Sequence, residues 1–186
     1  MANKLRPREV YEDFFHDIIC KMLPKFKRSN IRPTYQKNGG KALNNIVVDG
    51  GVVGAEGFQK GSNIIYLTVI FDTDTFESFT YEDGSVDVTR GLSLKLNIYG
   101  DQSQEVALIL FSLFRQNQFL MEFESNNIAL SSIGDITQFI EPINGEFWER
   151  RDLTIKFNEN VSIPVPNLNK VVVIDDTNII LGVDNE

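Results

Sequence analysis

Hydrophobic and polar residues alternate most regularly between residues 92 and 99. Every second position is apolar: Leu92, Leu94, Leu96 and Ile98. A period of two predicts a strand with one apolar face and one largely hydrated face. Gly100 ends this strand, and Asp101 with Gln104 three residues later has the spacing of a capping box.

The helix expected after this box is unusually apolar. Its main stripe has helical spacing and consists of Val106, Ile109, Leu110, Leu113 and Phe114. Ala107, Leu108 and Phe111 widen the stripe until little of the helix is polar. Such a helix needs cover from its own sheet and from a second partner. Residues 91–117 therefore predict a platform rather than a catalytic site.

Before this platform, the pattern predicts one helix and two strands. Residues 7–23 have helical periodicity, which Pro24 ends. Residues 31–36 are expected to be extended. Residues 63–71 form a nearly continuous apolar run, which suits a strand buried on both faces. Residues 72–84 are the expected return, with a tight turn at Asp83-Gly84, and the next strand starts at Val86 and pairs antiparallel.

After the platform, the pattern predicts only strands. Residues 119–124 and 126–131 flank Ser125-Asn126-Asn127 and predict a hairpin. A turn at Gly134-Asp135, a further strand to Ile140 and a break over 142–145 follow. Residues 147–157 are the last long strand, and residues 162–169 are expected to be an extended linker.

This order of helix, strands, helix and strands predicts an α+β fold. Its antiparallel β-sheet is packed by the N-terminal helix and the central apolar helix. We expect one domain over residues 1–166. It contains a flexible Gly-rich loop at 37–62, with a short strand conceivable at 46–48. Residues 167–186 are expected to be an extension, either a hairpin or an arm on a neighbouring subunit, with apolar runs at 171–174 and 179–183 around an acidic turn.

Composition narrows the classes of function. The 186 residues carry a net charge of −8, which argues against a general nucleic-acid surface, since phosphate contacts need clustered cations. The single basic cluster is best explained as a solvated helix end and contains Lys25, Lys27, Arg28 and Arg32. The single Cys20 excludes an internal disulfide. No signal peptide or membrane-spanning run is expected, and the protein should be made in a reducing cytoplasm.

Motifs that suggest chemistry are incomplete. Gly51, Gly54 and Gly57 lack the spacing of a phosphate-binding loop. Asp72-x-Asp74 lacks the later ligands of a calcium loop, and a solvated turn is expected there. The single histidine, His16, is expected on the surface or at an interface, and Cys20 is expected to be a buried thiol.

No nucleophile triad can be assembled from one histidine and one cysteine. Glu141 and Glu146 could act as an acid/base pair, but many other glutamates fit that description equally well. The sequence thus predicts no enzyme, cofactor or metal site.

Two adjacent arginines on the last strand face opposite sides of the sheet. Arg151 shares its face with Leu153 and Ile155, whereas Arg150 points the other way. A charge among apolar residues needs a carboxylate or an interface, unless Arg151 lies at the strand end and its head group reaches solvent. Both interpretations remain open.

Several of these segments together match a known pattern. They are F-F-H-D-I-I in the first helix, I-R-P-T-Y-Q-K after it, the alternating strand at 92–99 with its apolar helix, and G-D-I-T-Q-F-I-E-P-I-N-G-E-F-W-E-R-R-D-L-T-I-K-F. The chain resembles the tail terminator (neck, tail-completion) proteins of tailed bacteriophages. The resemblance covers most of the chain and consists of fold elements rather than a catalytic motif.

The resemblance implies a structural protein of the virion tail and neck, assembled in the host cytoplasm. Such proteins form a ring, usually a homohexamer, that caps the tail tube, terminates its polymerisation and meets the head connector. Six copies at −8 would give −48, so DNA should pass the lumen without specific binding. The candidate interface residues are Trp148, Glu149, Arg150 and Arg151 on the last strand and Gly50, Gly51, Gly54 and Lys60 in the Gly-rich loop.

Two other interpretations remain. The chain could be another tail, connector or baseplate structural protein. It could also be a small ligand-binding domain or enzyme that uses the Gly-rich loop as a lid, which would require a concave pocket with convergent polar groups.

Overall fold

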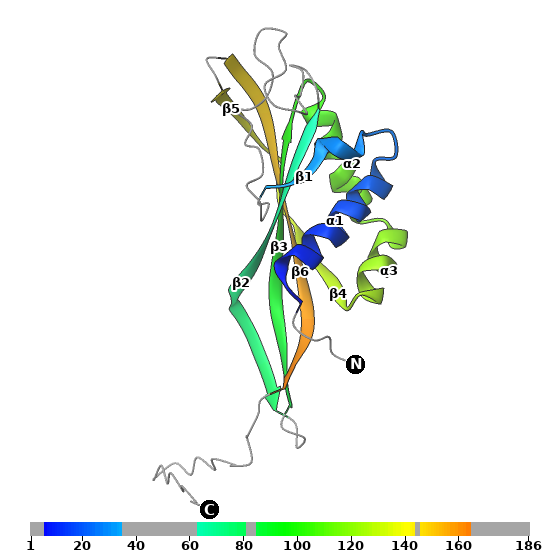
Figure 1. The fold of residues 1–186 in the computed structure, drawn as a ribbon, viewed down its shortest axis with the longest axis vertical. Helices are drawn as coiled ribbons and strands as arrows, with labels where there is room; N and C mark the ends of the chain where they lie inside the picture. Colours follow the sequence, from blue (N-terminus) through cyan, green and yellow to red (C-terminus); the bar gives the residue numbers. More distant parts are fainter. Residues whose placement is uncertain (1–5, 35–62, 81–84, 144–145, 165–186) are drawn as a thin grey trace, which may run out of the picture.

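The helices α1, α2 and α3 cover one face of a twisted sheet (Figure 1). This computed structural model describes residues 6–34, 63–80, 85–143 and 146–164. The elements in chain order are α1 (Arg8–Met22), the 3-10 helix η1 (Arg28–Asn30), β1 (Ile31–Pro33), β2 (Ile64–Thr80), β3 (Ser85–Tyr99), α2 (Ser103–Leu113), α3 (Asn117–Ser125), β4 (Ile128–Ile133), β5 (Thr137–Ile143) and β6 (Glu146–Pro164). None of the helices in these ranges is long and apolar enough to cross a membrane.

The sheet has the strand order β1-β2-β3-β6-β4, and β5 also pairs with β6. β4 lies along β6 near Phe157 and β5 lies along it near Arg150, so the two short strands share one edge of β6. All pairings are antiparallel except that of β1 with β2. The predicted α+β class is confirmed, and the short parallel β1 makes the sheet mixed.

The core lies between this sheet and the helices. Alternation puts Leu94 of β3 and Ile155 of β6 on the helix side of the sheet, and the strand register places them opposite each other. Both are fully buried. Phe123 of α3 stacks on Phe114 at 5.9 Å between ring centroids and meets Phe157 edge-on at 5.1 Å. This close aromatic contact fixes α3 against the segment after α2 and against β6.

The opposite face of the sheet carries a smaller buried cluster of Ile64, Tyr66, Tyr99 and Trp148. Together with Ile65 and Leu67 on the helix side, it confirms that the first half of β2 is buried on both faces.

The three long strands extend past the ends of the helices, in the lower part of Figure 1. The expected return at 72–84 and linker from 162 are therefore wrong where the structure describes them. Backbone pairing of β2 with β3 resumes at Glu77–Thr89 after a register shift, and β6 stays paired with β3 to Pro164. Residues 73–80 contain three threonines and two phenylalanines, which favour a strand over a turn. Asp72 lies within β2 and accepts a hydrogen bond from Ser93 Oγ at 2.8 Å.

The hairpin expected at 119–131 is also wrong in its first half, because residues 117–125 form α3. Phe119 and Phe123 are both buried, and their spacing of four puts them on one side of a helix. Asn127, at φ 56°, then turns the chain into β4. Asparagine tolerates this left-handed conformation better than most residues.

The prediction that Asp101 and Gln104 form a capping box is likewise wrong. α2 begins at Ser103 after Gln102, with no side-chain capping bond. The Gln104 side chain accepts a bond from β6 instead.

The remaining expectations divide into three groups. α1 and the strand after Gly134-Asp135 are confirmed, although β5 continues through Pro142 to Ile143. The turn expected at Gly134-Asp135 is wrong, because β4 and β5 both run antiparallel to β6 along the same edge, so the chain keeps its direction between them. The following segments lie outside the described residues: the Gly-rich loop 37–62 with Gly50, Gly51, Gly54, Gly57 and Lys60, the Asp83-Gly84 turn, and the C-terminal segment 167–186.

Candidate subunit interface

Arg151 lies on the helix side of β6 and is only 6% exposed. Its Nε donates a hydrogen bond to Gln104 Oε1 of α2 at 2.9 Å, and its Nη2 donates to Glu149 Oε1 at 2.6 Å. The interpretation that its head group reaches solvent is therefore wrong, because the charge is paired within the subunit. Its Nη1 is buried and has no acceptor among the described residues. A buried donor without an acceptor is costly and marks a place where a further acceptor would be stabilising.

Arg150 points to the opposite face, as its position in the strand predicts. It lies 2.7 Å from Glu141 Oε2 and 2.8 Å from Asp152 Oδ1, and its guanidinium lies over the Phe139 ring at 4.7 Å from the centroid. Tyr99 also donates to Glu141, at 2.8 Å. Burial, followed by this bond, raises the pKa of Tyr99 above its usual value. Glu141 thus belongs to an ion-pair network and not to an acid/base pair.

The other two strand residues of the candidate interface differ in exposure. Trp148 is 7% exposed, inside the small buried cluster, whereas Glu149 is exposed. The neighbouring Phe147 is 77% exposed, and Ile140 of β5 is 66% exposed. Sequence reasoning missed both. For Phe147 the signal was its parity, since it lies next to the buried Trp148 and therefore faces the other way. No comparable signal marks Ile140, because neither of its neighbours is buried.

The outer face of α2 is also apolar. Leu108 is 49% and Ile109 is 38% exposed, so the expectation that Ile109 belongs to the core stripe is wrong. The core side is instead made by Val106, Ala107 and Leu110. An open pocket of about 620 Å³ lies on the outer face, lined by Asp101, Gln102, Gln104, Glu105, Leu108, Ile109, Ser112 and Leu113. The second cover predicted for this helix is not supplied by the part of the chain that the structure describes.

A buried charge pair lies at the other end of the helix layer. Arg90 of β3 is directly opposite Glu159 of β6, and its Nε donates to Glu159 Oε2 at 2.9 Å. The Tyr11 hydroxyl of α1 donates to the same carboxylate at 2.7 Å and accepts from Arg90 Nη2 at 2.5 Å. Burial, followed by the contact with Glu159, raises the pKa of Tyr11 to about 12. Every charge here is paired, so this cluster stabilises the fold and is not a reactive site.

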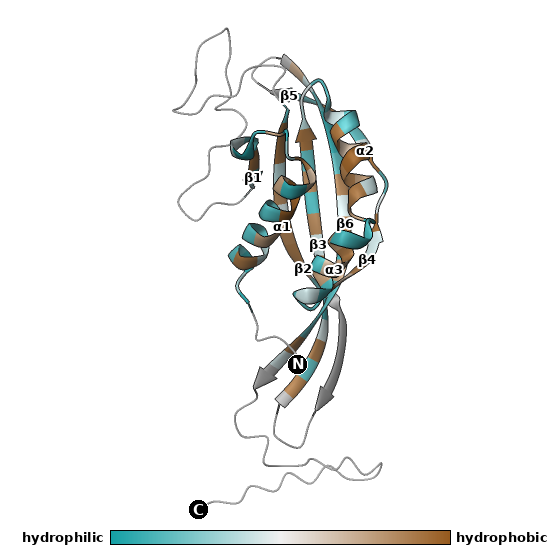
Figure 2. Cartoon of the chain, turned by 90° about the vertical axis from the view of Figure 1, so that its right-hand side faces the viewer, coloured by the Kyte–Doolittle hydropathy of each residue, from teal (hydrophilic) through white to brown (hydrophobic). Residues whose placement is uncertain are grey.

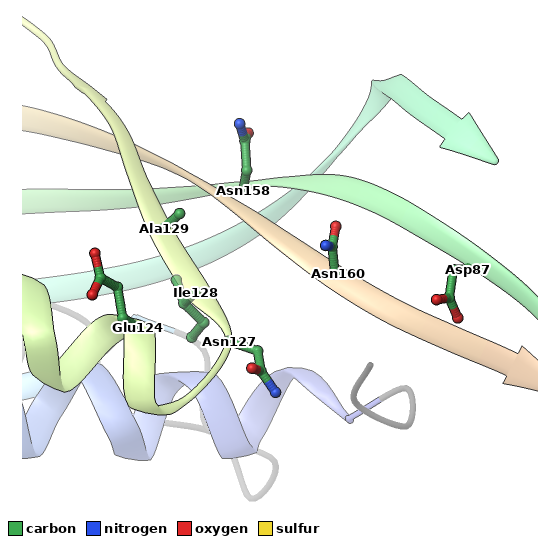
Figure 3. Close-up of a pocket in the computed structure, with 7 residues that line it drawn as sticks. All are labelled: Asp87, Glu124, Asn127, Ile128, Ala129, Asn158 and Asn160. Carbon is green, nitrogen blue, oxygen red and sulfur yellow. The ribbon is translucent and has the colours of Figure 1, made fainter. Parts of the chain in front are cut away.

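The second cavity is polar, with a volume of about 500 Å³. Its lining residues are Asp87, Glu124, Asn127, Ile128, Ala129, Asn158 and Asn160. Figure 3 shows Glu124 and Asp87 at opposite ends of this set rather than converging on one point. No group of three metal-ligating side chains occurs within the described ranges. This cavity therefore lacks the convergent polar groups that a ligand-binding site needs.

His16 and Cys20 do not form a catalytic pair. Both are partly buried, and Cys20 Sγ lies 3.9 Å from His16 Nε2. Burial raises the pKa of the Cys20 thiol, which disfavours the reactive thiolate.

The site thus consists of paired charges and exposed apolar side chains without a reactive centre, as expected of a surface that binds other proteins. A family model described as phage neck terminator protein matches residues 12–183. The chain belongs to this family. It is a structural component of the phage neck and tail that caps the tail and joins it to the neck, and it is not an enzyme. Comparison with individual curated proteins gives no match.

Proposed function

We propose that this neck terminator works as a closed homohexameric ring that caps the tail tube and offers its other side to the head connector. The main support for this proposal is the buried Nη1 of Arg151, which has no acceptor in the described part of the subunit. An acceptor from a neighbouring copy would stabilise it. The exposed apolar residues at the same end of the sheet and on α2 support it. They are Leu108, Ile109, Ile140 and Phe147.

The proposed contact surface includes Glu149, Arg150 and Arg151. Trp148 lies on the same strand as these charges, and its side chain anchors that strand in the small buried cluster with Ile64, Tyr66 and Tyr99. Arg151 also joins β6 to α2 through Gln104, so a contact on one element would be transmitted to the other.

Two segments outside the described residues complete the proposal. We assign residues 1–166 to one domain and residues 167–186 to an arm that contacts a neighbouring subunit. The Gly-rich segment, including Gly50, Gly51, Gly54 and Lys60, contacts a neighbour, the tube or the connector. Each copy carries −8, so a ring of six has an acidic character that lets DNA pass without specific binding.

Cryo-electron microscopy of the virion tests this proposal. We expect six copies in one ring at the junction of tail and neck, with Arg151 within reach of an acceptor from an adjacent chain. A different copy number would contradict the hexamer. A position at the distal baseplate would contradict the whole assignment, including the partners.

A further inference from the structure

We propose that neighbouring copies meet head to tail, with the outer face of α2 in one copy bound to the basic turn after α1 in the next. This inference rests on the proposed ring and names the two surfaces that build it. The α2 patch is defined here as Asp101, Gln104, Glu105, Leu108 and Ile109. The basic turn is defined as Lys25, Lys27 and Arg28.

The α2 patch combines apolar and acidic character. The exposed Leu108 and Ile109 line an open pocket, and Asp101 and Glu105 belong to the same lining. No lysine or arginine contributes to this lining. Arg115, beyond the end of the helix, stacks on Phe111 at 4.2 Å instead. The patch therefore suits a partner that brings positive charge together with the aliphatic stems of long side chains.

The basic turn has these properties. Lys25, Lys27 and Arg28 are all exposed. Arg28 binds Asp17 at 2.5 Å, whereas neither Lys25 nor Lys27 has an ion pair within the described ranges. The turn is held in place, because Phe26 packs partly against the core and its N–H donates to the Leu23 carbonyl at 2.9 Å. A fixed turn loses little conformational freedom when it binds.

The two surfaces occupy different places on the molecule. α1 packs on β1 and β2, at one edge of the sheet, whereas α2 packs on β3 and β6. Figure 2 shows α1 and α2 on opposite sides of the helix layer. A contact between two different surfaces of the same chain is heterologous, and such contacts close into rings when the rotation allows. Two different complementary surfaces on one chain therefore suit a ring of several copies better than a two-fold dimer, in which the same surface would meet itself.

Charge favours the same partner. Each copy carries 26 acidic and 18 basic residues, so copies repel unless complementary patches oppose each other. The basic turn brings three cations together within four residues, and this local positive charge complements the acidic residues Asp101 and Glu105 of the α2 patch. Opposed charges at a rim orient the approach of two proteins and suppress wrong pairings.

Charge reversal tests the inference on the full-length protein. We expect Glu105→Lys to weaken self-association by about tenfold or more, since it replaces an attraction with a repulsion. Lys27→Glu should do the same. The protein that carries both changes should regain most of the loss, because the opposite charges again face each other. Glu124→Lys is the control, since it makes the same charge change on α3, outside the patch.

Sedimentation velocity measures the association, and thermal unfolding of each variant checks that the subunit stays folded. Failure of the double variant to recover, with each single variant folded and weakened, would overturn the pairing of these two surfaces. An equal loss in Glu124→Lys would overturn it too, because the effect would then follow net charge.

Disulfide formation in assembled particles gives a second readout. A chain with Glu105→Cys and Lys27→Cys should yield a ladder of covalent oligomers, whereas a chain with Glu124→Cys and Lys27→Cys should not. No ladder in particles that contain the ring would overturn this inference and leave the proposed function intact. Particles without a ring of this protein would overturn the proposed function as well.

Discussion

Arg90 and Glu159 illustrate how a few residues decide whether a charge can be buried. Both are less than 10% exposed, which would be costly for either charge alone. Their cross-strand register brings guanidinium and carboxylate together, and Tyr11 and the ring of Phe71, 4.4 Å from the Arg90 guanidinium, complete the enclosure. Both residues lie outside the segments 92–99 and 147–157, whose faces the sequence predicts, so their burial was not predicted. Their pairing could not be predicted, because the sequence does not show which residue of β6 lies opposite which residue of β3.

Tyr11 predicts a pH dependence of stability. Its pKa of about 12 in the folded protein exceeds the value near 10 of an unfolded chain. The folded state therefore keeps a proton that the unfolded state releases, so the stabilisation is complete below pH 10 and is lost as pH rises towards 12. Raising the pH from 8 to 11 should therefore lower the free energy of unfolding by about 1.4 kcal/mol through this single group.

The measurement is denaturant unfolding of the wild type and of Tyr11→Phe at both pH values. We expect the variant to be about 1–2 kcal/mol less stable at pH 8, because a buried hydrogen-bond donor is lost. The gap should narrow at pH 11. A gap of constant size would mean that Tyr11 titrates equally in both states.

At the scale of elements, Arg151 is the link between β6 and α2. Arg151→Ala should cost about 2–3 kcal/mol of unfolding free energy, below the range for fully buried pairs, because Glu149 can return to solvent. Arg150→Ala should cost about 1 kcal/mol, since its ion pairs on the other face are partly hydrated. Urea unfolding gives both values, and sedimentation gives the oligomer. Equal losses would contradict the special position of Arg151, whereas lost assembly with a stable monomer would place Nη1 at the subunit contact.

The elements also show where sequence reasoning succeeds. Strands with strict alternation, such as β3 and the centre of β6, were predictable together with their faces. The reason is that alternation within one strand decides which of its residues share a face, whichever residues of the next strand lie opposite. α3 was not, since a nine-residue helix with two buried phenylalanines also fits a short strand. The start of α2 failed for a related reason. Gln104 had a local partner in the capping box and a distant one in Arg151, and the tertiary contact prevailed.

For the molecule as a whole, exposed apolar side chains are most numerous on α2 and on β5 and β6, where Leu108, Ile109, Phe139, Ile140 and Phe147 lie. Val10, Ile70 and Met121 are single exposed residues on α1, β2 and α3. The sequence predicted that the apolar helix needs a second cover. It could not tell which side of the helix stays uncovered, because that depends on how α2 sits on β3 and β6. Leu108 and Ile109 answer this question, and they place the surface for a partner on the side of α2 that faces away from the sheet.

Net charge gives the last prediction, which concerns DNA. Tight binding to DNA requires several cations that neutralise phosphates, and it weakens steeply with salt. Lys25, Lys27 and Arg28 bring three cations together within four residues, and the proposed head-to-tail contact covers them in the assembled ring. We therefore expect the assembled protein to bind duplex DNA no more tightly than about 10⁻⁴ M at physiological salt, the weak end of non-specific binding. A gel-shift titration measures this, with Lys27→Glu as the comparison. Micromolar binding that falls with salt and disappears in Lys27→Glu would mean that the basic turn contacts DNA rather than the next subunit.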